Sequence, residues 1–172
     1  AMLWAAAKAE NRPLDLDQLR AALNEFSGVK RRFEFYVNHP KQVYMDDYAH
    51  HPRELGAAIS SVRAMFPKRH LTAIFQPHLF TRTRDLYDGF AEALSMADEV
   101  VLLPIYPARE LPIEGVCSEM IGRALKVEWQ LVEREALAER LRTMATDVVV
   151  TFGAGNIDAV CEEIYDVLKT KM

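Results

Sequence analysis

Apolar residues recur along most of this chain with the periods of strands and helices. From residue 42 onward, short apolar runs alternate with longer stretches whose apolar side chains lie three or four positions apart. The first pattern is typical of buried strands and the second of helices with one buried face. The expected strands cover residues 42–46, 70–75, 99–103, 129–132 and 147–152. The expected helices cover residues 52–66, 86–94, 120–125, 136–144 and 157–168.

This alternation of strands and helices predicts the fold class. Strands that are joined through helices run parallel, and continuous apolar strands such as residues 99–103 are typical of sheets buried on both faces. We therefore expect an α/β fold with a Rossmann-like, doubly wound and mostly parallel sheet. Phe33, Phe35 and Val37 alternate with more polar neighbours, which predicts one more strand, paired as a hairpin through the turn at His39-Pro40.

A different pattern precedes the alternating region. Residues 1–9 and 14–26 have helical spacing, and Ser27-Gly28 is a typical helix end. Two short helices without a sheet cannot bury a core of their own. We therefore expect residues 1–29 to be the end of a preceding domain, so that the chain begins inside that domain, and residues 30–172 to be the α/β domain.

Composition and charge narrow the class of protein. The chain has 172 residues, of which 50% are hydrophobic and 27% charged, as is ordinary for a globular protein. Its net charge of -4 argues against general nucleic-acid binding. It shows no apolar run of transmembrane length and no signal peptide, so no membrane partner is expected. Cys117 and Cys161 lack metal-ligand spacing, and two lone cysteines favour a reducing, cytoplasmic location.

The most polar loop follows the strand at residues 42–46, where ligands bind in sheets of this kind. Pro52 then suits the first position of a helix. A metal site is one interpretation, because carboxylates and imidazoles both ligate divalent ions, but adjacent imidazoles tend to point apart. We favour a catalytic or ligand-orienting loop over two alternatives, a metal site and a solvated turn. The loop carries Asp46, Asp47, Tyr48, His50 and His51.

A second polar loop, predicted for residues 76–84, contains His78, Arg82 and Arg84. Arginine side chains bind carboxylates or phosphates through paired N–H donors. The alternative is a purely structural role, in which Arg84 and Asp85 only mark the start of a helix. This alternative is plausible for Arg84 and weaker for Arg82.

Three other groups are less specific. The basic segment Lys30-Arg31-Arg32 either meets phosphates or is a solvated run of charge. Arg109-Glu110 lies in a proline-rich loop, where packing and catalysis explain it equally well. The turn Gly153-Ala154-Gly155-Asn156 follows a strand, as phosphate-binding turns do, but the dinucleotide fingerprint is incomplete and a tight turn is the default interpretation.

Six segments of the chain together resemble the Mur ligases, a family of bacterial peptidoglycan synthesis. They span nearly the whole chain in the family's order, and the second and third are highly specific. The resemblance is greatest to members that join L-alanine to UDP-N-acetylmuramate; a related member that adds a tripeptide to this sugar differs after the strand at residues 70–75. The segments are GVKRRF at 28–33, DDYAHHP at 46–52, FQPHLFTRTRDL at 75–86, IYPARE at 105–110, PIEGVCS at 112–118 and FGAGNI at 152–157.

The resemblance implies a three-domain enzyme of which this chain is the C-terminal Rossmann-like domain, preceded by the last helices of the central ATPase domain. ATP and Mg²⁺ are the implied cofactors. The P-loop and the magnesium ligands belong to the central domain, so no metal ligand is expected here and the fragment alone is expected to be inactive. In the implied reaction ATP converts the muramate carboxylate into an acyl phosphate, which the amine of L-alanine attacks.

The same resemblance implies roles for individual residues in ATP binding. Arg32 matches an arginine that reaches the ATP phosphates, whereas Lys30 and Arg31 are assigned no role. Either Asp46 or Asp47 matches an aspartate that binds the ATP ribose, and the double acid leaves the register open.

Other matched residues line the amino-acid site, where His50 and Arg82 are expected to be catalytic. A neutral imidazole at His50 would accept a hydrogen bond from the incoming ammonium or take its proton, unless His50 only orients the loop. Leu79 stands where relatives often have arginine, which leaves more of the carboxylate binding to Arg82. The residues of this site are Tyr48, His50, His78 and Arg82.

A non-catalytic α/β ligand-binding module is the alternative from another class. Such a module should contain a complete nucleotide site, and no complete phosphate loop is present in the sequence. The ligase domain is therefore favoured, with ATP, L-alanine and UDP-N-acetylmuramate as partners of the full-length enzyme.

Overall fold

The protein is described by a computed structural model in which residues 15–25 and 28–172 are placed. Its centre is a six-stranded sheet of order β1-β2-β6-β3-β4-β5. Strand β1 is antiparallel to β2, and all other neighbours are parallel, which confirms the expected mostly parallel α/β sheet. The strands are β1 (Glu34–His39), β2 (Gln42–Asp47), β3 (Leu71–Phe75), β4 (Glu99–Leu102), β5 (Glu128–Leu131) and β6 (Val148–Phe152).

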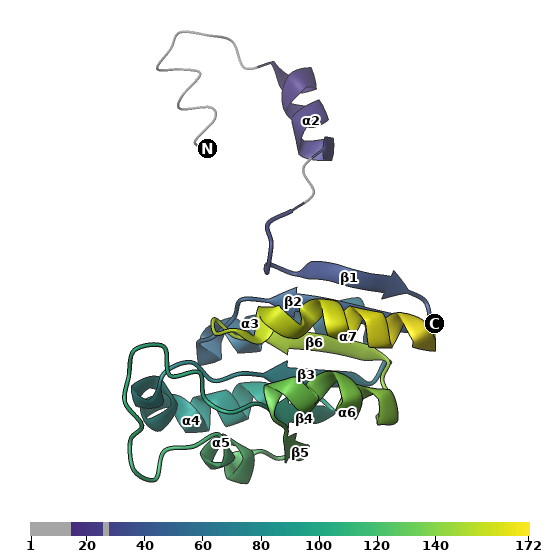
Figure 1. Cartoon of the computed structure of the whole chain (residues 1–172). Helices are drawn as coiled ribbons and strands as arrows, with labels where there is room; N and C mark the ends of the chain where they lie inside the picture. The colour runs from purple at the N-terminus through teal and green to yellow at the C-terminus, as the bar shows by residue number, and fades with distance from the viewer. Residues whose placement is uncertain (1–14, 26–27) are drawn as a thin grey trace, which may run out of the picture.

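Helices cover both faces of this sheet (Figure 1). One face packs against α3, α4 and α5, and the other against α6 and α7. The helices are α2 (Leu16–Glu25), α3 (Pro52–Met65), α4 (Phe80–Leu94), α5 (Glu119–Ala124), α6 (Leu137–Thr143) and α7 (Cys161–Leu168). Three short 3₁₀ turns are η1 (Arg134–Ala136), η2 (Ile157–Val160) and η3 (Lys169–Lys171).

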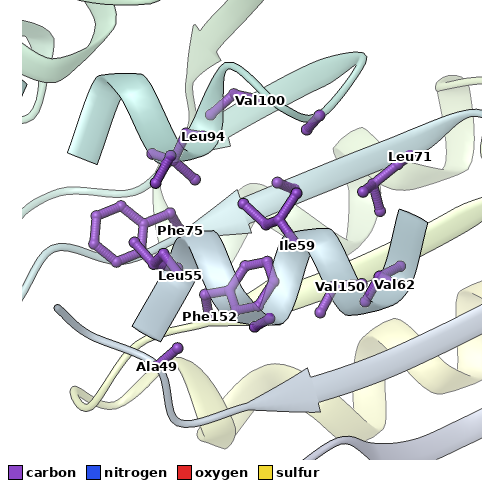
Figure 2. Close-up of a cluster of buried hydrophobic side chains, with 14 of the residues drawn as sticks. Ala49, Leu55, Ile59, Val62, Leu71, Phe75, Leu94, Val100, Val150 and Phe152 are labelled. Atoms are coloured by element: carbon purple, nitrogen blue, oxygen red, sulfur yellow. The ribbon is translucent and has the colours of Figure 1, made fainter. Parts of the chain in front are cut away.

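The two helical layers follow from side-chain periodicity. Leu55, Ile59 and Val62 form one stripe of α3 and are fully buried against the sheet (Figure 2). Along β6, Val148, Val150 and Phe152 face this layer, while Val149 faces α6 and α7. Because successive strand residues point to opposite faces, an apolar run such as that of β6 fills both cores at once.

Strand β1 was predicted correctly, but the faces of the sheet to which its side chains point were not. Phe35 was expected to share a buried face with Val37, yet Phe35 is 42% exposed and Val37 only 4%. The register with β2 shifts between these residues, since Phe35 pairs with Met45 and Val37 with Tyr44. Tyr36 is therefore the extra residue of a β-bulge, which places Phe35 and Val37 on opposite faces.

Helix α4 begins earlier than the sequence predicted. Residues 76–84 were expected to form a loop, but the helix starts at Phe80. Leu79 has a left-handed backbone (φ 73°) that turns the chain, and its carbonyl accepts the first helical bond from the amide of Thr83 (3.1 Å). This correction moves Arg82 and Arg84 from a loop to the first turns of a helix.

Helix α2 confirms a predicted helix and stands apart from the sheet in Figure 1. None of its residues is buried. The helix expected at residues 1–9 and the helix end expected at Ser27 lie outside the described residues, and the domain boundary near residue 30 stays a prediction. Within the placed part of the chain, every helix is too short or too polar to cross a membrane.

Candidate active site

The carboxyl ends of the parallel strands meet at one edge of the sheet, where five segments come together. The hinge (residues 28–33) enters the domain there, at the left of the sheet in Figure 1. Ligands bind at this edge in doubly wound folds. The other segments are the β2 loop (48–51), the β3 loop (76–79), the proline loop (103–118) and the glycine turn (153–156).

Asp46 and Arg31 form a buried pair that fastens the hinge to this edge. The Asp46 side chain is fully buried and accepts hydrogen bonds from Thr151 Oγ1 (2.6 Å) and Arg31 Nε (2.9 Å). Arg31 also donates to the carbonyl of Gly153 (2.5 Å). Burial raises the pKa of Asp46, although the bonds from Thr151 and Arg31 oppose that change. Arg31, for which no role was predicted, is thus the main link between hinge and sheet.

Asp47 is also bonded within the chain. Its two carboxylate oxygens accept from the amides of Phe33 (3.0 Å) and Ala49 (2.9 Å), and it is 5% exposed. Arg31 and Arg32 both lie against the ring of Tyr48, with guanidinium carbons 5.0 and 5.9 Å from its centroid. Arg32 is exposed, so it is the arginine of the hinge that faces solvent.

The two histidines of the β2 loop have different partners. His50 Nδ1 lies 3.0 Å from the carbonyl oxygen of Tyr48 and 3.4 Å from the Glu54 carboxylate. Its ring lies 6.2 Å from that of His78, centroid to centroid. His51 instead caps α3, where its Nδ1 accepts a hydrogen bond from the amide of Arg53 (3.3 Å). Only His50 therefore belongs to the cluster at the edge of the sheet.

The β3 loop and the start of α4 contribute His78 and Arg82. The His78 ring stacks on Tyr106 at 5.7 Å, and burial, followed by the charge of Arg82, lowers the pKa of His78. Among the described residues, His78 Nδ1 and Arg82 Nη1 are buried without a hydrogen-bond partner. Such groups are uncommon and reduce stability, so they indicate where a polar ligand would be bound.

Gln76 carries a third unpaired atom at this edge. Its Nε2 donates to Asn156 Oδ1 (2.9 Å), while its Oε1 is buried without a partner. The glycine turn approaches Gln76 so closely that a Cβ on Gly155 would lie 2.5 Å from Gln76 Oε1 and 2.7 Å from the Cβ of Tyr106. Gly153 has φ 146°, a conformation that favours glycine. The glycines are therefore required for close packing at the edge of the sheet.

A hollow of about 380 Å³ lies elsewhere, next to the amino ends of β3 and β4. Its charged residues have partners, since His70 Nε2 lies 3.7 Å from Glu99 and Asp147 pairs with Arg69. None of its lining residues has a buried side-chain polar atom without a partner. Of these two places, only the carboxyl edge contains buried side-chain polar atoms without a partner.

The structure brings together Tyr48, His50, His78 and Arg82, and it adds Tyr106 and Glu110, whose roles were missed. The His78–Tyr106 stack and the bonds between Thr81 and Glu110 connect the proline loop to this cluster. The signal in the sequence was the IYPARE segment, for which packing and catalysis were left open at Glu110 and no role was assigned to Tyr106.

Comparison with known proteins identifies the family. The model of the Mur ligase glutamate ligase domain matches residues 31–155. UDP-N-acetylmuramate–L-alanine ligase of Cytophaga hutchinsonii is 46% identical over 88% of this chain and 33% of its own length. The enzyme of the same name from Porphyromonas gingivalis is 45% identical over 96% of this chain and 37% of its own length. The chain thus spans about a third of the length of the curated relatives that it matches.

Solved structures agree with this result. A crystal structure of UDP-N-acetylmuramate-alanine ligase from Thermotoga maritima has a TM-score of 0.74 at 27% identity, and it covers 98% of this chain and 36% of its own. A murein peptide ligase from Psychrobacter arcticus shares the fold, with a TM-score of 0.66 at 22% identity over 94% of this chain and 35% of its own. From the matched domain and these relatives, we conclude that the chain belongs to the Mur ligase family.

Proposed function

We propose that this chain is the C-terminal domain of an ATP-dependent ligase that joins L-alanine to UDP-N-acetylmuramate through an acyl phosphate in peptidoglycan synthesis. The observation that carries this proposal is its identity of 42–46% to relatives that bear the name of this enzyme. In this proposal the acyl-phosphate step belongs to the whole enzyme, which acts in the cytoplasm, and this domain would bind the amino acid and part of the ATP. The relatives support this division because the chain covers only about a third of their length.

The amino-acid site of the proposed enzyme is the cluster around His78. Arg82 would pair with the carboxylate of L-alanine, since its buried Nη1 has no partner within the described chain. The lowered pKa of His78 keeps its imidazole neutral near neutral pH. The imidazoles of His50 and His78 would receive the ammonium group, and His50 would take its proton before attack. Tyr48 would line this site.

ATP would bind next to the hinge. Arg32 would contact the phosphates, because it is exposed beside Tyr48, whereas Arg31 is bonded to Asp46. Of the two candidate acids, Asp47 would bind the ribose, because it retains some exposure and Asp46 has none. Mg²⁺ would be held mainly by the central domain of the longer enzyme, where it would offset the charge of the reacting phosphates.

The test uses the full-length ligase that carries this domain. With ATP, Mg²⁺ and UDP-N-acetylmuramate, it should add L-alanine and not the tripeptide that related family members add to the same sugar. Arg82→Ala should raise the Michaelis constant for L-alanine by an amount equivalent to about 2–5 kcal/mol, with that for ATP nearly unchanged. Arg84→Ala, an exposed neighbour paired with Asp85, is the matched control. Preference for the tripeptide, or equal loss for both substrates, would contradict the proposal.

A second measurement separates the roles of His50 and Asp47. In His50→Ala, borohydride should still trap the acyl phosphate although alanine-dependent turnover falls. Asp47→Asn, which keeps the size of the side chain, should weaken the binding of ATP. The 172-residue chain alone should show background turnover only. If His50→Ala abolishes the trapped product, His50 acts at the phosphate step and its assignment is wrong.

A further inference from the structure

The proline loop holds the main chain of the β3 loop from one side. The amide of Tyr106 donates to the carbonyl of Pro77 (2.8 Å), and the amide of Leu79 donates to the carbonyl of Tyr106 (2.9 Å). These bonds form a parallel bridge between His78 and Tyr106. The conformation of the β3 loop, including the left-handed backbone of Leu79, is therefore supported by a segment of the chain that lies beyond β4.

The same loop also supplies the cap of α4. The residue at the N-cap position, Leu79, has no side-chain capping bond, so the first amides of the helix need another acceptor. Glu110 provides it from 29 residues away: one carboxylate oxygen accepts from the amide of Thr81 (3.0 Å) and the other from its hydroxyl (2.5 Å). A carboxylate is favoured there, because it meets both the free amides and the positive end of the helix dipole.

The bonds of the proline loop leave the side chains of the site unpaired. Tyr106 and Glu110 bond to groups of residues 77–81, whereas His78 Nδ1 and Arg82 Nη1 stay buried without partners. Arg82 directly follows Thr81, so the direction of its side chain depends on how the first turn of α4 is held. The turn is thus fixed through groups other than those proposed to bind substrate.

We propose that Glu110 is a positioning residue of the amino-acid site, which caps α4 from the proline loop and thereby orients Arg82 and His78 toward L-alanine. This inference rests on the proposed function, since it takes the ligand at this site to be the amino acid. Glu110 itself does not contact the substrate. Its part is to hold the geometry of the binding groups, as the supporting residues around a functional site do.

Charge gives Glu110 a second effect, which a purely structural cap lacks. Three charged or titratable groups from different elements act on His78: Arg82 of α4, His50 of the β2 loop and Glu110 of the proline loop. Burial, Arg82 and His50 lower the pKa of His78, and Glu110 opposes them. The bonds from Thr81 lower the pKa of Glu110, which keeps it ionised. Removing this charge should therefore lower the pKa of His78 further.

The experiment compares three substitutions in the full-length ligase. Glu110→Gln removes the charge and keeps the size of the side chain, while Thr81→Val removes only the hydroxyl donor. Glu114→Gln, an exposed acid of the same loop, is the matched control. Glu110→Gln should raise the Michaelis constant for L-alanine about fivefold, the factor that corresponds to the free energy of one helix cap, with that for ATP unchanged. Thr81→Val should show a smaller change of the same kind, and Glu114→Gln none.

Titration of His78 by NMR in the 172-residue chain gives a readout that does not depend on activity. The pKa of His78 should fall in Glu110→Gln and should not change in Glu114→Gln. An unchanged His78 titration together with an unchanged Michaelis constant for L-alanine would overturn the inference, as would equal losses for L-alanine and ATP.

A double substitution separates this inference from the proposed function. Because Glu110 is proposed to act in part through Arg82, adding Glu110→Gln to Arg82→Ala should raise the Michaelis constant by a smaller factor than Glu110→Gln does alone. If Arg82→Ala alone has no effect on L-alanine, the proposed function of the site is wrong. If Arg82→Ala raises the Michaelis constant for L-alanine and Glu110→Gln does not, only the positioning role of Glu110 is wrong.

Discussion

The ends of β2 and β3 lie at the same edge of the sheet but use their polar groups in opposite ways. At the end of β2, Asp46 and Asp47 each accept two hydrogen bonds from the chain itself. At and beyond the end of β3, Gln76, His78 and Arg82 each keep one buried side-chain atom without a partner. The first arrangement stabilises the fold, whereas the second reduces stability and prepares a binding site.

This difference teaches that a dense cluster of titratable residues is not by itself a binding site. The β2 segment is the more conspicuous in the sequence, yet both of its acids fasten the hinge, and only Asp47 keeps some exposure through which it could also meet a ligand. The β3 segment is the better candidate for ligand binding, because its groups are held in place and still unpaired. Substitutions should therefore have different consequences in the two regions, and the following predictions proceed from the largest expected effect to the smallest.

Asp46→Ala should cause the largest loss of folding stability. It leaves Arg31 without its buried partner and removes the acceptor of Thr151, and breaking a buried ion pair costs about 3–5 kcal/mol. Denaturant unfolding of the 172-residue chain measures this change. Asp85→Ala, which breaks the exposed pair with Arg84, should leave the free energy of unfolding nearly unchanged. Equal losses in the two variants would show that the buried pair of the β2 region stabilises the fold no more than an exposed pair does.

Gly155→Ala should disturb the β3 region and the proline loop that packs on it. The new Cβ would meet Gln76 Oε1 and the Tyr106 side chain at distances that real contacts do not show, and overpacking of this kind costs about 1–3 kcal/mol. In the full-length ligase we also expect a higher Michaelis constant for L-alanine, because Tyr106 stacks on His78. Gly56→Ala in α3, whose nearest neighbour would be 3.9 Å away, should be neutral or slightly stabilising.

Arg82→Met should separate stability from function. It removes a buried, unpaired polar group, so the free energy of unfolding should stay unchanged or rise by up to about 1 kcal/mol. L-alanine binding by the full-length ligase should be lost in the same variant. Thermal unfolding and initial rates measure the two effects. A loss of stability as large as that of Asp46→Ala would make Arg82 a structural residue.

The smallest expected effect is a dependence of stability on pH that arises from His78. Because the folded-state pKa of His78 is lowered, the unfolded chain binds a proton on this imidazole at higher pH than the folded chain does. Stability should therefore fall as the pH drops below about 6.5, and His78→Gln should weaken that fall. Since His78 is partly exposed, the contribution is below about 1 kcal/mol. Unfolding at pH 5 and 7.5 tests this, and a steeper fall in the variant would contradict it.

Side-chain periodicity predicted most of the fold because the sheet is buried on both faces. The run at residues 147–152, for example, is found as β6 (Val148–Phe152). The failures have tertiary causes. The facing of Phe35 depends on a bulge, and the start of α4 depends on the left-handed Leu79, which the proline loop supports. Neither feature has a local period that a sequence pattern could show.

The candidate site was predicted in its residue types but not in its bonding. The resemblance to Mur ligases indicated His78 and Arg82, and their roles in binding stay predictions. Nothing in two adjacent arginines shows that Arg31 turns inward and Arg32 outward, because this depends on the left-handed backbone of Arg31 (φ 57°). The capping of α4 by Glu110 joins residues far apart in sequence, so only a structure reveals it.

The bulge at Tyr36 also affects how readily another strand could pair with the edge of the sheet. Strand β1 is the outermost strand on its side of the sheet, and a regular outer strand offers unpaired N–H and C=O groups to which a strand of another molecule can add. A bulge interrupts that row of groups and increases the local twist. The irregularity that exposes Phe35 therefore makes β1 a poor template for sheet extension and so protects the domain against aggregation through this edge.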